Sequence, residues 1–152
     1  MNKMVKVVRV EAFLMPTPPY VPVITCHLED GRQFTLYYVP YEIVIAINRI
    51  QGENYEVERE SVFDVLPMVT GDLRDKLRSR IRAVYIDYLN KETMLYTATM
   101  EIKVDGAIVR RRMIPSHAIY LALLSNSDIY ILDDLVKQQE EMGSRSRDER
   151  VL

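Results

Sequence analysis

One short pattern occurs twice in the chain, and the two copies stand 75 residues apart. In each copy an Asp-Gly pair, Asp30-Gly31 or Asp105-Gly106, is followed by eight residues, then a proline and an apolar segment. Asp-Gly favours a tight hairpin turn, and proline fits the first turn of a helix. The pattern therefore predicts two hairpin–strand–helix units that share one sheet, because neither unit can bury its apolar face alone. Chance is the alternative, since both signals are common.

The spacing of apolar residues places the elements around these units. Strict alternation from Met94 to Val104 predicts the clearest strand. Helices are predicted to begin at Pro40, after Ser61, after Gly71 (with Leu73, Leu77 and Ile81 on one side) and at Pro115. The other predicted strands cover 5–14, 21–28, 32–39, 83–89, 107–114 and a short piece at 129–130. These elements predict an α+β domain with a mixed β-sheet, flanking helices and two similar hairpin–strand–helix halves.

Composition excludes several classes of protein. A net charge of −2 provides no global field that would attract nucleic acid, so such binding needs a local basic patch. A single cysteine, Cys26, excludes an internal disulfide framework and fits a reducing compartment. No apolar run approaches the roughly 18 residues that span a bilayer, and the first residues show no apolar export signal. We therefore expect a cytoplasmic protein without a membrane partner.

The segment from Pro115 to Leu123, Pro-Ser-His-Ala-Ile-Tyr-Leu-Ala-Leu, is the most specific motif. It is preceded by Glu29-Asp-Gly-Arg32, Val39-Pro-Tyr-Glu-Ile43 and Asp64, and followed by Ile129-Tyr130 and Leu135-Val136. In this order the segments resemble the bifunctional nuclease domain family. The resemblance covers residues 5–136. It predicts a domain at 1–136. The charged tail at 137–152 is expected from its composition to extend a helix for a turn or two and to be partly disordered from Gly143, because it has nothing to bury.

The resemblance implies deoxyribonuclease and ribonuclease activity, as in some members of the family. Four polar positions depart from the family pattern: Arg112 and His117 replace Asp, Ile114 replaces Arg, and Phe63 replaces His. Two hypotheses follow. The protein is a nuclease that cleaves DNA or RNA phosphodiester bonds, or it is a non-catalytic oligomeric module with a degenerate site that binds nucleic acid or regulates. A small-ligand pocket between the halves is a third possibility.

Phosphodiester hydrolysis usually needs one or two divalent ions, such as Mg²⁺ or Mn²⁺, held by carboxylates. No acidic cluster of known nuclease spacing is present, so the metal ligands stay unknown. The catalytic candidates are Glu42, Asp64, Ser116 and His117. Each also has a structural interpretation, because Glu42, Ser116 and His117 fall in first helical turns and Asp64 has capping-box spacing from Ser61.

Two groups of arginines are candidates for binding the phosphates of DNA or RNA. Arg78 and Arg82 share a predicted helical stripe, whereas Arg110 and Arg112 share one face of a predicted strand that leads to the helix at Pro115. We expect a phosphate groove where these arginines meet the start of that helix. A solvated charged face, with Asp72 and Lys76 as an i,i+4 pair, is the alternative. Tyr- and Met-rich strands also predict a homo-oligomer, such as a dimer.

Overall fold

The computed structural model describes residues 2–151, together with the side chains of residues 2–143. Seven strands and five helices follow one another in this part of the chain. The strands are β1 (Met4–Leu14), β2 (Pro22–Leu28), β3 (Gln33–Tyr37), β4 (Ile81–Asn90), β5 (Leu95–Val104), β6 (Ala107–Met113) and β7 (Asp128–Leu132). The helices are α1 (Tyr41–Ile50), α2 (Val62–Val69), α3 (Leu73–Arg80), α4 (Pro115–Ser125) and α5 (Asp133–Val151).

The strands form one mixed sheet in the order β3-β2-β1-β7-β4-β5-β6. Every neighbouring pair is antiparallel except β4 and β7, which run parallel. This architecture confirms the predicted α+β class and the mixed sheet. The last strand of the chain, β7, occupies the centre of the sheet and joins β1 to β4, a position that no local signal in its short sequence predicts.

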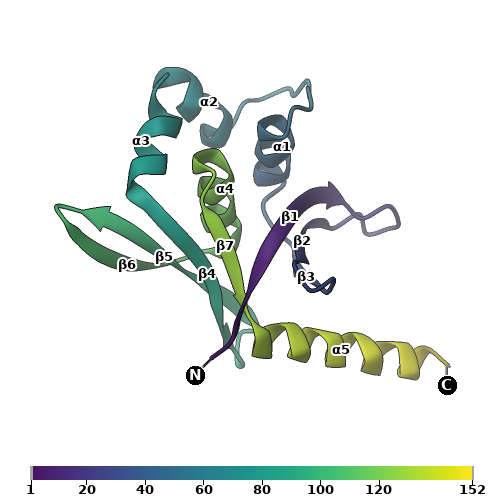
Figure 1. The fold of residues 1–152 in the computed structure, drawn as a ribbon. Coiled ribbons are helices and arrows are strands. Elements are labelled where there is room, and N and C mark those ends of the chain that lie inside the picture. Colours follow the sequence, from purple (N-terminus) through teal and green to yellow (C-terminus); the bar gives the residue numbers. More distant parts are fainter. Residues whose placement is uncertain (1, 152) are drawn as a thin grey trace.

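The two predicted units lie on either side of β7 (Figure 1). The first unit is β1-β2-β3-α1 and the second is β4-β5-β6-α4, so the repeat also includes the strand before each hairpin. Gly31 and Gly106 occupy the hairpin turns with φ of +89° and +81°, a conformation that would be strained in a residue with a side chain. Pro40 immediately precedes α1, and Pro115 is the first residue of α4. The units therefore share both their order of elements and their turn chemistry.

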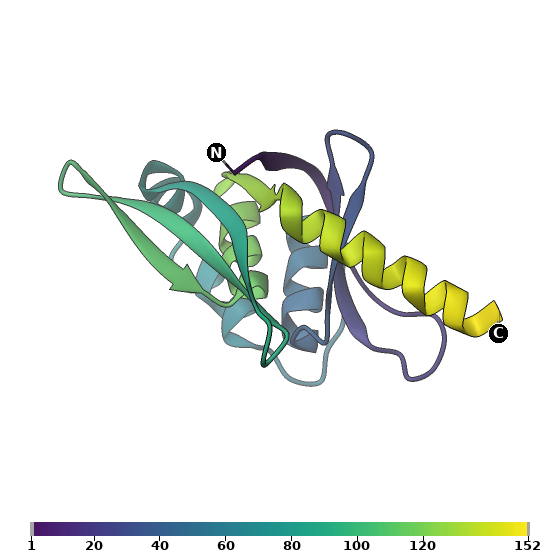
Figure 2. The ribbon, with the colours of Figure 1, turned by 90° about the horizontal axis from the view of Figure 1, so that it is seen from below.

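Helices α1 and α4 lie side by side against one face of the sheet (Figures 1 and 2). Helix α1 packs on β1 and β2, whereas α4 packs on β4, β5 and β7. Helix α4 is buried on most sides, because α1, α3 and the sheet surround it. It ends at Asn126, whose left-handed conformation (φ 56°) closes the helix.

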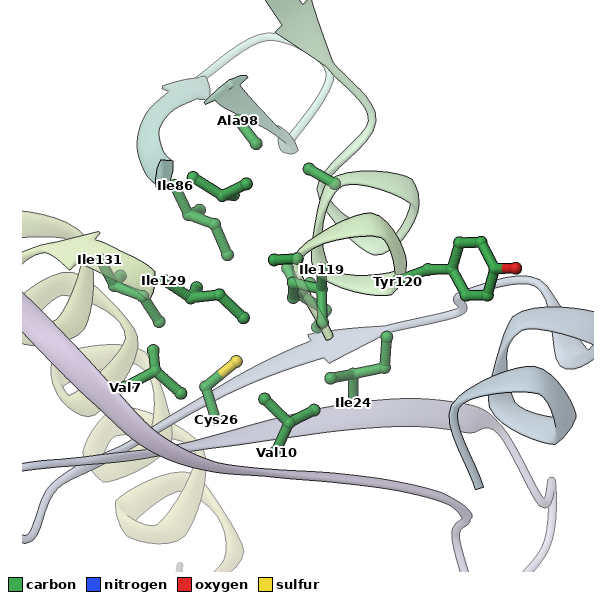
Figure 3. Packing of buried hydrophobic residues seen from close by; sticks show 14 of the residues in the cluster. Val7, Val10, Ile24, Cys26, Ile86, Ala98, Ile119, Tyr120, Ile129 and Ile131 are labelled. Carbon is green, nitrogen blue, oxygen red and sulfur yellow. The ribbon is translucent and has the colours of Figure 1, made fainter. Parts of the chain in front are cut away.

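The core is continuous across both units (Figure 3). Cys26 of β2 lies opposite Ile129 of β7, and Ile24 of β2 lies beside Ile119 of α4. Cys26 is fully buried, and burial raises the pKa of its thiol to about 12. Such a thiol is neutral and inert at physiological pH.

Helix α5 leaves the centre of the sheet and runs along the first unit toward β3 (Figures 1 and 2). Polar contacts of Arg32 with Asp133 and Glu140, and of Gln139 with β3, hold it there. Arg32 Nη2 lies 2.6 Å from Asp133 Oδ1, and the Gln139 side chain forms two hydrogen bonds with the Thr35 backbone. Within residues 2–151, no helix combines the length and apolar character needed to cross a bilayer.

Three details of the sequence prediction change. Ile81 was expected at the end of a helix but is the first residue of β4, where it is buried beside Ile102. Met94 was expected in a strand but lies in the β4–β5 turn with φ of 60°. Helix α5 continues to Val151, well beyond the turn or two expected. The predicted disorder from Gly143 onward falls mainly on residues whose side chains lie outside those described, so it stays a prediction.

Candidate nucleic-acid interface

The sheet turns one face of β7, β4 and β5 toward α4 and the other face away from the helices (Figures 1 and 2). Alternation along β4 buries Val84 and Ile86 inward and turns Tyr85 outward. In the neighbouring strand β7, Tyr130 is the direct partner of Tyr85. The two rings are nearly parallel, at 16°, and their centroids are 5.3 Å apart. The outward face therefore carries an ordered aromatic pair.

A buried carboxylate fixes this aromatic pair to the next strand. The Tyr85 hydroxyl donates to Glu101 Oε1 at 3.0 Å, and Arg110 Nη2 lies 3.0 Å from Glu101 Oε2. The side chain of Glu101 is 6% exposed, whereas that of Arg110 is 67% exposed. Burial and the hydrogen bond to Glu101 raise the pKa of the Tyr85 hydroxyl. Glu101 is thus satisfied from two sides, and Arg110 keeps most of its guanidinium in water.

Two further arginines lie on the same outward side. Arg112 is the β6 partner of Thr99, and its guanidinium carbon lies 4.8 Å from the centre of the Tyr88 ring. That distance is typical of a cation–π contact. Arg82 is exposed on β4, three residues before Tyr85, and its charge slightly opposes the rise in the pKa of Tyr85. Arg82 lies at an irregularity in the pairing of β4 with β5, where the register shifts between Ile81 and Ala83.

We call this surface the tyrosine–arginine face. Its members are Tyr85, Tyr88, Tyr130, Arg82, Arg110 and Arg112. Acidic side chains border it and reduce its positive charge. Asp128 pairs with Lys6 at 3.6 Å, and Asp87 accepts a hydrogen bond from the Thr99 hydroxyl at 2.9 Å. The face therefore combines one exposed ring, Tyr88, and two half-buried rings, Tyr85 and Tyr130, with a moderate excess of arginine.

The structure brings together three of the four predicted phosphate-binding arginines. Arg110 and Arg112 share one side of β6, as alternation predicts, and Arg82 joins them from β4. Arg78 does not, because α3 carries it toward α4, where its Nε donates to the Ser125 carbonyl at 3.4 Å. The predicted meeting of arginines with the start of α4 stays a prediction, and no arginine is among the described residues that line the cavity beside Pro115.

Asp64 has a structural role in holding α2 to α1. Its side chain is 6% exposed, Oδ1 lies 3.1 Å from Arg49 Nη1, and Oδ2 accepts from the Ser61 hydroxyl at 3.1 Å. The predicted capping box is therefore modified, because Ser61 bonds the Asp64 carboxylate and makes no side-chain bond to the helix backbone. Arg49 also pairs with Glu60 at 2.7 Å, which closes the connector between the two helices.

The other three catalytic candidates lie at helix starts. Glu42 is exposed in the first turn of α1, where its charge complements the helix dipole. Under the repeat, His117 occupies the corresponding position of α4, and its ring meets Phe63 edge-on with centroids 5.4 Å apart. Ser116 is buried and lines a cavity. The start of α4 therefore faces aromatic and apolar neighbours.

These residues do not fit a divalent metal site. Both oxygens of Asp64 are engaged by Arg49 and Ser61, and Glu42 stands in solvent. Among the side chains that the structure describes, no group of three or more His, Cys, Asp or Glu is placed to hold an ion. The carboxylate chemistry that the family resemblance implies therefore has no assembled donor set here.

Sequence reasoning missed Tyr85, Tyr130 and Glu101 as members of the candidate site. Their alternation within β4, β5 and β7 was visible, but the partners across the sheet were not. The central place of β7 decides which tyrosines meet, and that place depends on long-range pairing.

The comparisons with known proteins add no family. No protein-family model matches the chain, and no curated protein matches it.

Proposed function

We propose that the protein binds single-stranded nucleic acid across the tyrosine–arginine face. The observation that carries the proposal is the gathering of three arginines and three tyrosines on a sheet face that the helices leave open. Aromatic rings on a sheet offer stacking platforms for bases, and arginines bind the phosphates between them. A flat face of this kind suits a single strand, whose bases are free to stack.

The charges of the face predict the strength and the salt dependence of binding. Arg82 and Arg112 have no ion-pair partner among the described residues, whereas Arg110 is neutralised by Glu101. If the arginines contact two or three phosphates of a single strand, the logarithm of the binding constant should fall with the logarithm of the salt concentration with a slope near −0.7 per contact. Affinity should therefore be moderate and depend on stacking as much as on charge.

Fluorescence anisotropy with labelled oligonucleotides of about 12 nucleotides, RNA and DNA, tests the proposal at roughly 50 and 200 mM salt. Tyr130→Leu should raise Kd by about fivefold or more, since stacking on an aromatic ring contributes roughly 1–3 kcal/mol per base. Arg112→Ala should weaken binding and reduce the salt slope by about one contact.

Arg59→Ala is the matched control, because Arg59 is exposed in the connector before α2 and changes charge by the same amount. Equal weakening by Arg59→Ala and Arg112→Ala would show that binding is a response to net charge alone. Unchanged affinity in Tyr130→Leu would remove the stacking platform from the proposal.

A nuclease is the second candidate, and it rests on the family resemblance of the chain. Incubation of the same oligonucleotides with Mg²⁺ or Mn²⁺ measures it. Cleavage lost in Glu42→Ala or His117→Ala would support the nuclease, whereas binding without cleavage supports the module. The predicted homo-oligomer stays a prediction, which sedimentation velocity at two protein concentrations tests.

A further inference from the structure

A cavity of about 740 Å³ lies where the two units and α5 meet. Residues 36–40 at the end of the first hairpin form one wall, and residues 94–96 and 114–116 of the second unit form another. Gln139, Met142 and Gly143 of α5 close it from the side. Its volume falls within the usual range for small-molecule sites, roughly 300–1,000 Å³. None of its lining residues that the structure describes carries a charge.

The polar groups of the cavity are few and converge at the start of α4. Ser116 is 3% exposed, and its hydroxyl has no hydrogen-bond partner among the described residues. Every fully enclosed side-chain oxygen and nitrogen in that part of the chain has a partner, so the Ser116 hydroxyl must open onto the cavity. It is thus a largely buried residue whose hydroxyl, with no hydrogen-bond partner among the described residues, is available to a ligand in the cavity.

The backbone around Ser116 adds donors of the same kind. No side chain caps α4, and its first N–H groups have no partner within the helix. Pro40, at the start of α1, lies on the opposite wall, so the positive ends of two helix dipoles are directed to one space. A negative group on a ligand would satisfy the hydroxyl and these N–H groups together.

The remaining walls suit an apolar body. Leu95 and Tyr38 are 67% and 77% exposed, an unfavourable state for large apolar side chains that a bound molecule would relieve. Tyr38 and Met94 also hold positive φ of 57° and 60° on facing walls. Strained backbone of this kind clusters at ligand sites.

We propose that this cavity binds a small amphipathic acid. Its apolar body lies against Leu95, Tyr38 and Met142, and its anionic group accepts hydrogen bonds from the Ser116 hydroxyl and the start of α4. The site is separate from the tyrosine–arginine face, so ligand binding here does not depend on the proposed binding of nucleic acid.

Two fluorescent probes with the same aromatic body test the proposal on the full chain. 1-Anilinonaphthalene-8-sulfonate carries an anionic group, and N-phenyl-1-naphthylamine lacks it. Wild-type protein should bind the sulfonate more tightly than the amine. Leu95→Trp, which fills the cavity from an exposed position, should abolish binding of both probes. Val69→Trp is the matched control, because Val69 is 76% exposed on α2 and does not line the cavity.

Ser116→Ala separates the anionic contact from apolar binding. It should weaken the sulfonate about tenfold, the usual scale for a hydrogen bond to a charged group, and leave the amine unchanged. Equal weakening of both probes, or unchanged sulfonate binding in Leu95→Trp, would overturn the proposal. Loss of probe binding as the protein dimerises would also overturn it, by showing that a second copy closes the cavity.

Discussion

Gln139→Leu tests how much the Gln139 side chain contributes to holding α5 at the edge of the sheet. Gln139 Oε1 accepts from the Thr35 N–H at 2.7 Å, and Gln139 Nε2 donates to the Thr35 carbonyl at 2.8 Å. The amide therefore occupies the place that a further strand would take beside β3. Each hydrogen bond contributes about 0.5–1.5 kcal/mol net, and leucine keeps the apolar stem, so the loss should be about 1–3 kcal/mol.

The thermal stability of the whole protein and the hydrogen exchange of single amides both test this prediction. In a chain of 152 residues, about 2 kcal/mol should lower Tm by roughly 4–8 °C, measured by circular dichroism. Hydrogen exchange is more specific, because the Thr35 amide loses the acceptor that it has among the described residues and should exchange much faster. The Cys26 amide on the neighbouring strand should keep its protection. Gln138→Leu is the control, since Gln138 makes no side-chain hydrogen bond with the described residues.

Unchanged exchange at Thr35 in Gln139→Leu would refute the reasoning. It would mean that the edge amide is protected by the packing of α5 and not by the side-chain amide. A fall in Tm of the same size in Gln138→Leu would lead to the same conclusion, because it would show a general sensitivity of α5 to leucine.

Three further predictions concern packing and pH. Ile119→Ala should lower the free energy of unfolding by about 2–5 kcal/mol, measured by urea titration. The control Ile108→Ala, at a position 37% exposed, should lower it by less than about 1 kcal/mol. Equal losses in the two variants would contradict the position of the core. Cys26 should resist iodoacetamide at about pH 8 until the protein unfolds. Burial raises the pKa of Cys26 in the folded protein from 9.0 to about 12, so the stabilisation from its neutral thiol is complete below pH 9 and is lost as pH rises toward 12. Between these pH values the urea midpoint should therefore fall less in Cys26→Ala than in the wild type. Hydrogen bonds from Arg32 lower the pKa of Asp133, so the stabilisation from this pair is present above pH 3.8 and is lost as pH falls through the lowered pKa. Arg32→Leu should therefore make the loss of folding stability at acid pH shallower. Identical acid-unfolding profiles of the variant and the wild type would contradict this prediction.

The local parts of the fold could be predicted from the sequence because their causes are local. Asp-Gly turns and helix-starting prolines act within a few residues, so both hairpins and the starts of α1 and α4 were found. The central position of β7 could not be found, because it depends on pairing with strands far away in the chain. Ile81 shows a different limit. A buried residue at a helix–strand junction satisfies the helical spacing of Leu73 and Leu77 and also the first inward position of β4.

The candidate sites show the same division. Alternation along β6 was enough to put Arg110 and Arg112 on one side, and it was correct because it is a property of a single strand. The meeting of Tyr85 with Tyr130 depends on the register between β4 and β7, two strands that are far apart in the sequence. The cavity needs segments from both units and from α5, so Ser116 could be recognised as a residue at a helix start but not as part of a wall.

Arg112 is a position at which the sequence differs from the bifunctional nuclease domain family that it resembles. The family usually has Asp at this position, and a carboxylate there would face the Tyr88 ring and lie on the same face as Asp87. The negative face of an aromatic ring repels an anion and attracts a guanidinium.

Arg112→Asp should therefore weaken nucleic-acid binding more than Arg112→Ala does, because it removes a phosphate contact and adds repulsion. It should not produce cleavage with Mn²⁺, since the other carboxylates of the region are already engaged by Arg110, Lys6 and Thr99. Cleavage gained by this single change would show that the arginine suppresses a nuclease site, and the binding proposal would then have to give way to the catalytic one.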